Sequence, residues 1–115
     1  MLGIPTLSEV RTWVAVPASA ISDADLTQIL DAELAIQART CRLPDDPDPV
    51  TGGEATYPAA LVRSVLRRCQ REVAAKALPL GIVGSDGTEF GPMLLRSWDA
   101  EVARLEASYR QVVIA

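Results

Sequence analysis

Histidine is absent from this chain of 115 residues, and cysteine occurs only twice. The commonest general base and the commonest metal ligand of proteins are therefore missing. Cys41 and Cys69 belong to no C-x-x-C pair, which excludes zinc-finger spacings. We expect both thiols to be small buried hydrophobes, out of reach of one another, in a reducing compartment.

Motifs for nucleotide binding and serine hydrolysis are lacking too. The chain has no G-x-S-x-G elbow, no G-x-x-x-x-G-K-[ST] phosphate loop and no G-x-G-x-x-G fingerprint. Asp45, Asp46 and Asp48 lack the spacing and the closing glutamate of a calcium site, and a solvated loop explains them. We therefore expect no catalytic residue, no cofactor and no metal site, and we do not expect an enzyme.

Basic residues are fewer than acidic ones, 11 against 15, which gives a net charge of −4. This charge argues against a protein that binds nucleic acid through a general positive field. Hydrophobic residues make up 49% of the chain, enough for one folded domain. The apolar stretch from Trp13 to Ile21 is interrupted by Pro17 and is too short to span a membrane. The N-terminus lacks the basic flank and apolar core of a signal peptide, so we expect a cytoplasmic location after synthesis.

Helix caps and apolar spacing predict an all-α fold, a small bundle of three main helices plus a short N-terminal helix. The short helix follows the capping box at Thr6 and ends before Pro17. The second helix begins at Ser22 and runs to about Cys41. The third begins near Pro58 and ends near Leu78–Pro79. Its predicted apolar side consists of Leu61, Val62, Val65, Leu66, Cys69 and Val73.

The last helix is predicted to start near Pro92 or Met93. Its apolar stripe is the cleanest in the chain and consists of Leu94, Leu95, Trp98, Val102, Leu105 and Tyr109. Glycine and proline predict long loops at about 42–56 and 78–91. The β-branched residues of 111–115 predict a short extended tail.

Two charge patterns leave alternatives open. Arg63, Arg67 and Arg71 recur every four residues, opposite the apolar side of the third helix. They form a solvated face, contact phosphate, or dock on an acidic partner. Glu33 falls within the apolar arc of the second helix. It either pairs with an arginine of the next helix or faces a neighbouring subunit.

The C-terminal VVIA also has several explanations. It pairs within its own domain, is disordered, or adds a strand to a partner's sheet.

Two stretches carry a family resemblance: YPAALVRSVLRRCQREVAAKALPLGIVGSDGTEFGP, from Tyr57, and the ending W-D-A-E-V-x-x-L-E-x-x-Y-R-x-V-V-I-A. With the two capped helices before them, they resemble the head-to-tail adaptor (head-tail connector) proteins of actinobacterial siphophages. The resemblance covers nearly the whole chain and is strongest from Tyr57 to Ala115. It implies a structural virion protein at the head-tail neck, present in the host cytoplasm before assembly.

Such proteins form a ring of about twelve copies beneath the portal, and a ring needs two different complementary faces on each subunit. The resemblance implies that the ring extends the channel through which DNA passes without specific binding, and that it supports the next neck protein, the stopper. The candidate subunit faces are Asp31 and Glu33 on one side and Arg63, Arg67 and Arg71 on the other. The candidate portal-docking residues are Leu80, Ile82, Val83 and Phe90 in the loop, and Val112, Val113, Ile114 and Ala115 in the tail.

Two other functions compete with the adaptor. A small helical DNA-binding or regulatory module would use the arginine face of the third helix on phosphates, although the net charge and the absence of a helix-turn-helix spacing count against it. A stopper protein is the other alternative, and we expect stoppers to be rich in β-structure.

Overall fold

The structure, a computed structural model, describes residues 1–15, 17–77, 82–83, 93–94 and 99–111, with side chains described outside 76–98. The described part is all-α, as the sequence predicted. Its helices are α1 (Leu7–Val14), α2 (Asp23–Thr40), α3 (Ala59–Ala77) and α4 (Ala100–Glu106). Two strands of two residues each, β1 (Ile82–Val83) and β2 (Met93–Leu94), pair antiparallel after α3.

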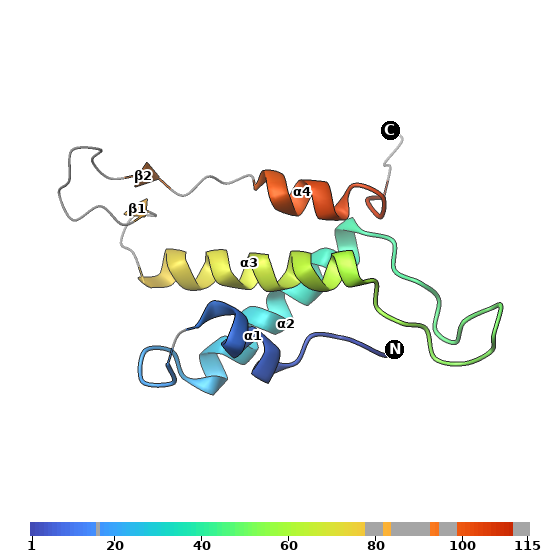
Figure 1. The fold of residues 1–115 in the computed structure, drawn as a ribbon, viewed down its shortest axis with the longest axis horizontal. Helices are drawn as coiled ribbons and strands as arrows, with labels where there is room; N and C mark the ends of the chain where they lie inside the picture. The colour runs from blue at the N-terminus through green and yellow to red at the C-terminus, as the bar shows by residue number, and fades with distance from the viewer. Residues whose placement is uncertain (16, 78–81, 84–92, 95–98, 112–115) are drawn as a thin grey trace.

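Helix α3 is the centre of the molecule and packs against each of the other three helices. Figure 1 shows α4 running antiparallel to α3 on one side, with α1 and α2 on the other. The β1–β2 pair lies at the end where α3 finishes, and the loop between α2 and α3 projects at the opposite end (Figure 1).

Side-chain caps set the beginnings of the first two helices. The Thr6 hydroxyl accepts a hydrogen bond from the backbone N–H of Glu9, at 3.2 Å. The Ser22 hydroxyl does the same for Asp25, at 3.2 Å. Each cap satisfies a donor that the first helical turn leaves without a partner. The bounds predicted for α1, α2 and α3 are confirmed to within about two residues, the usual uncertainty at helix ends.

The core lies where α3 meets α1 and α2. Leu26, Leu61, Val65 and Cys69 have an exposed fraction of 0%. Burial of one such leucine contributes about 1.5–3 kcal/mol. Cys41 and Cys69 are both free and buried, as predicted. Burial raises the pKa of the Cys69 thiol to about 12, which keeps it protonated near neutral pH.

The last helix is shorter than predicted. Met93 and Leu94, expected in its first turn, form β2, and α4 begins at Ala100 after the cap residue Asp99. The helix ends at Glu106, so Tyr109 lies in the turn that follows. Tertiary contacts explain the start, because Asp99 is held by arginines of α3 and so caps the helix there.

The segment after α4 pairs with the end of α2. Cys41 and Arg110 form an antiparallel bridge, and the backbone N–H of Gln111 donates to the carbonyl of Thr40 at 3.0 Å. Gln111 is the one residue of the predicted tail, 111–115, that the structure describes, and its backbone bonds to α2 of the same chain. The other tail residues, 112–115, lie outside the described residues.

Candidate interaction groove and buried charge cluster

Two members of the arginine row of α3, Arg67 and Arg71, bind the cap residue of α4. Arg67 Nε lies 2.9 Å from Oδ2 of Asp99, and Arg71 Nη1 lies 3.5 Å from the same atom. Asp99 also accepts hydrogen bonds from the backbone N–H groups of Glu101 and Val102, at 2.9 and 3.3 Å. One carboxylate therefore caps α4 and attaches it to α3.

Hydrogen bonding keeps Asp99 ionised. Burial alone raises its pKa, but the hydrogen bonds from Val102 and Arg67 outweigh that effect, and the pKa lies below its ordinary value. Two of the three arginines in the predicted interface face are thus engaged within the chain.

Arg63 has a different environment. Its guanidinium carbon lies 5.8 Å from the ring centroid of Trp13 on α1, within cation–π range. The Trp13 indole N–H donates to Oε1 of Gln70 at 3.2 Å, which fixes the ring across α3. No carboxylate of the described residues forms an ion pair with Arg63.

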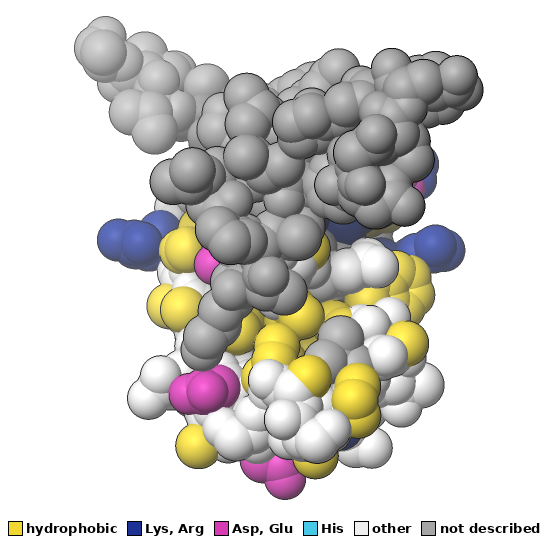
Figure 2. Space-filling view, turned by 90° about the vertical axis from the view of Figure 1, so that its left-hand side faces the viewer, with side chains coloured by type: hydrophobic (Ala, Val, Ile, Leu, Met, Phe, Trp, Pro, Cys, Tyr) yellow, Lys and Arg dark blue, Asp and Glu magenta, His cyan; other side chains and the backbone are white. Residues whose placement is uncertain are grey.

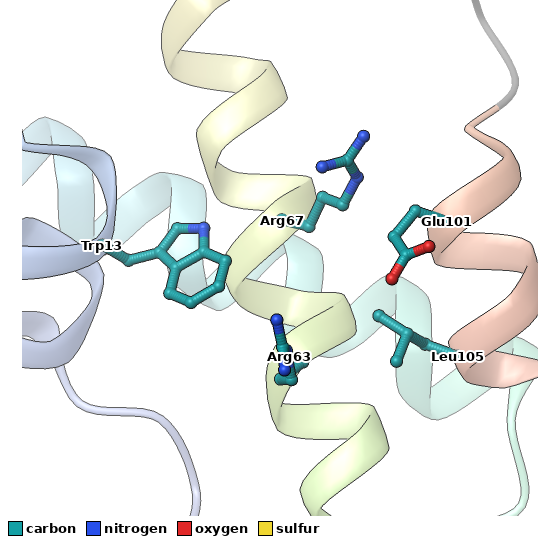
Figure 3. Close-up of a pocket in the computed structure, with 5 residues that line it drawn as sticks. All are labelled: Trp13, Arg63, Arg67, Glu101 and Leu105. Atoms are coloured by element: carbon teal, nitrogen blue, oxygen red, sulfur yellow. The ribbon is translucent and has the colours of Figure 1, made fainter.

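These side chains enclose an open groove of about 200 Å³ on the face of α3 between α1 and α4. Figure 3 shows Trp13 on one side, Glu101 and Leu105 on the other, and Arg63 and Arg67 between them. Glu101 is turned to Arg104, 2.6 Å away, a hydrogen bond that lowers the pKa of Glu101. The groove combines an aromatic wall, an aliphatic wall and the unpaired positive charge of Arg63.

Glu33, predicted either to pair with an arginine or to face a neighbour, lies inside the chain with an exposed fraction of 7%. Its Oε2 is 3.8 Å from Nη1 of Arg68 on α3. The ion-pair alternative is confirmed. Glu33 is not an interface residue in this structure, because the apolar arc of α2 that contains it packs against α3. Asp31 is exposed on α2.

Below the arginine row, a closed polar cluster joins α2, α3 and α4 around the carboxylate of Glu106. Arg68 binds this carboxylate with two hydrogen bonds, of 2.9 and 2.7 Å. Gln37 donates to it at 3.2 Å, and Ser64 donates to it as well. Tyr57 in turn donates to the side-chain oxygen of Gln37. Among the described residues, no buried side-chain nitrogen or oxygen lacks a partner.

The cluster shifts the pKa values of its two carboxylates, Glu106 and Glu33, in opposite directions. Burial raises the pKa of Glu106, but the hydrogen bonds from Arg68, Ser64 and Gln37 outweigh it and lower the pKa to about 2. Burial raises the pKa of Glu33, and the charge of Arg68 opposes this only in part. Arg68 therefore stabilises the ionised form of Glu106 more than that of Glu33, because it lies 2.7 Å from the Glu106 carboxylate and 3.8 Å from that of Glu33.

Pairs of carboxylates whose pKa values are shifted apart also occur in enzymes that use acid–base catalysis. Here Glu106, Ser64 and Gln37 each have an exposed fraction of 0%, so a substrate has no route to them. In this structure the cluster holds α4 against α2 and α3, and its residues are separate from those that line the groove.

The helical spacing of the buried residues could have predicted part of this cluster, although the sequence analysis did not use it. Leu26, Leu30, Glu33 and Gln37 follow one another at helical spacing, so Gln37 continues the buried stripe of α2. Ser64 likewise lies between the core residues of α3. The residue at the centre, Glu106, could not be identified from spacing, because its neighbours come from two other helices.

The candidate docking residues of the loop and the tail are only partly described. Ile82 pairs with Leu94 and Val83 with Met93 in the β1–β2 ladder. Leu80, Phe90 and the tail residues Val112, Val113, Ile114 and Ala115 lie outside the described residues.

No family model, curated protein or solved structure matches this chain. In the part of the chain that the structure describes, no group of three or more Cys, Asp or Glu side chains could hold a metal ion. None of the described helices has the length and hydrophobicity required to cross a membrane.

Replacing Asp99 by alanine should lower the free energy of unfolding by about 1–2 kcal/mol, the cost of losing a helix cap together with its partly exposed ion pairs. Asp99→Asn keeps an acceptor for the cap and removes the charge, so its loss should be about half as large. Urea unfolding followed by circular dichroism measures both. Equal stability of Asp99→Ala and the unchanged protein would contradict the role given to this residue.

Proposed function

We propose that this chain is a structural virion protein, a ring-forming head-to-tail adaptor that docks on the portal, extends the DNA channel and links capsid to tail. The support from the sequence is the resemblance carried by residues 57–115. Support from the structure is the all-α architecture, in which one central helix packs against the other three and a buried charge cluster joins α2, α3 and α4.

The observation that carries the proposal is the position of the two apolar candidate segments relative to α3. Ile82 and Val83 follow the C-terminal end of α3, whereas the tail leaves Gln111 beside Thr40, near the N-terminal end of α3 (Figure 1). At 1.5 Å per residue, the 19 residues of α3 separate these ends by about 28 Å. The two contacts with the portal are therefore separate and can be removed one at a time.

The surface at the β1 end favours contact with another protein. Figure 2 looks at this end: below the residues that are not described, hydrophobic side chains are exposed, with lysine or arginine side chains at two flanks and acidic side chains at the left and at the bottom. An apolar centre with a charged rim is typical of protein–protein contacts.

Deleting residues 112–115 should abolish binding to a portal protein from the genome that encodes this chain. The tail is expected to add a strand to the portal, and its main-chain hydrogen bonds would be lost together with the valine side chains. Co-purification of the two proteins measures binding, and circular dichroism confirms that the helices remain. Ile4→Ser, at an exposed apolar residue elsewhere on the chain, is the matched control and should bind normally. Unchanged binding after the deletion would reject the role of the tail.

The DNA-binding alternative is less well supported. It requires Arg63, Arg67 and Arg71 to be free to contact phosphates, but Arg67 and Arg71 already form ion pairs with Asp99. A single unpaired arginine on a chain of net charge −4 is a weak phosphate-binding surface.

A further inference from the structure

The loop between α2 and α3 holds an apolar side chain away from the rest of the molecule. Val50 has an exposed fraction of 91%, the highest among the exposed large hydrophobic residues of the described part. Asp48 stabilises the turn, because its carboxylate accepts hydrogen bonds from the backbone N–H groups of Val50 and Thr51, at 2.7 and 3.2 Å. The backbone of Asp48 also bonds Gly52 and Gly53, at 2.7 Å each. Val50 is therefore presented by a hydrogen-bonded loop.

The same loop carries acidic side chains on both sides of Val50 in the sequence. Asp46 binds the N-terminal amino group at 2.7 Å, which ties the base of the loop to the start of the chain. Asp45 and Glu54 are exposed, and neither forms an ion pair with a described residue. The loop thus offers one branched apolar side chain together with two exposed carboxylates, of which Glu54 also interacts with the N-terminal amino group.

The groove on α3 has the complementary chemistry. Trp13, with an exposed fraction of 37%, and Leu105 provide apolar walls, and Arg63 provides a positive charge without an ion-pair partner among the described residues. The volume of about 200 Å³ is sufficient for a valine side chain. Tryptophan and arginine are both enriched among the residues that dominate the binding energy of protein interfaces.

The two features lie on different surfaces of one chain. The loop projects at the end where α3 begins, and the groove opens on the face between α1 and α4 (Figures 1 and 3). Because Val50 is almost fully exposed, the loop does not fill the groove of its own chain. A contact between two such surfaces is heterologous, so it continues from copy to copy and closes into a ring if the rotation permits.

We infer that Val50 of one copy inserts into the groove formed by Trp13, Arg63 and Leu105 of the next copy. Asp45 and Glu54 then face Arg63, in place of the acidic face on α2 that the sequence suggested. This inference rests on the proposed function in that a ring adaptor requires a heterologous contact between its copies.

Directed disulfide formation tests the contact even if free copies associate weakly. Val50→Cys and Leu105→Cys variants are made separately, mixed at about millimolar concentration and oxidised; Cys41 and Cys69 are buried and stay unchanged. The mixed disulfide should form about tenfold faster than between Leu105→Cys and Ala35→Cys, an exposed site on α2, because docking raises the effective concentration. Equal rates for the two pairs would overturn the inference.

Charge reversal provides a second test on exposed residues that do not endanger folding. Arg63→Glu alone, and Asp45→Arg with Glu54→Arg, should each weaken self-association in sedimentation experiments by about two- to fivefold, the range of exposed ion pairs. The chain carrying all three substitutions should recover the association of the original. Failure of this recovery, or a chain that remains monomeric at millimolar concentration without preferential cross-linking, would contradict the contact.

Portal binding separates the two proposals. If the chain forms the Val50–Leu105 cross-link but does not bind a portal, the contact between copies is supported and the adaptor function is contradicted. If the chain binds a portal but cross-links equally at the control site, the adaptor function is supported and the contact is contradicted.

Discussion

Glu106→Ala should lower the free energy of unfolding by about 3 kcal/mol or more, the largest effect we expect from one substitution. The substitution removes the acceptor of Arg68, Ser64 and Gln37 at once and leaves their donors in the interior. Helix α4 has only seven residues, and apart from this cluster the ion pairs of its cap residue Asp99 with Arg67 and Arg71 attach it to α3. Urea unfolding followed by circular dichroism measures the loss.

Glu101→Ala is the matched control for Glu106→Ala. It removes a glutamate of the same helix that is bound to a single arginine, Arg104, at the surface. Its cost should stay below about 1 kcal/mol. If Glu106→Ala does not fold, Glu106→Gln retains the volume and part of the hydrogen bonding, and it should give an intermediate loss. A loss for Glu106→Ala no larger than for Glu101→Ala would contradict the structural role of the cluster.

Acid should destabilise the fold as the pH falls from about 4.5 to about 2. The pKa of Glu106 is about 2 in the folded chain against an ordinary value of 4.5. The folded state therefore favours the ionised form, and this contribution is present above the ordinary pKa and lost as protons bind. The difference corresponds to about 3 kcal/mol. Unfolding measured at several pH values within this window reports the loss.

Glu33 contributes with the opposite sign. Burial raises its pKa in the folded chain, so its contribution is complete at low pH and decreases as the pH rises through the folded value. Glu33 therefore offsets part of the acid loss caused by Glu106. In Glu106→Gln the acid-dependent loss should become smaller, and the part that remains should come from carboxylates such as Asp99, whose pKa also lies below its ordinary value. Parallel pH profiles of Glu106→Gln and the unchanged protein would show that another carboxylate is responsible.

The predicted interface residues show the limit of spacing arguments. Arg63, Arg67 and Arg71 were correctly placed on one side of α3, but helical spacing does not say what faces that side. Asp99, from a segment about thirty residues later, engages two of them. Glu33 was rightly suspected of pairing with an arginine, and its partner Arg68 lies outside the arginine row.

Local patterns in the sequence were sufficient to predict the all-α class, the beginnings of α1 and α2, the extent of α3 and the burial of both cysteines. These features depend on hydrogen bonds and apolar spacing within a few residues, so neighbouring positions in the chain specify them. Helix packing was needed to establish where α4 begins, which charges lie inside, and that a tryptophan of α1 and a leucine of α4 line one groove. Those outcomes depend on side chains that are far apart in the sequence and meet only when the helices pack.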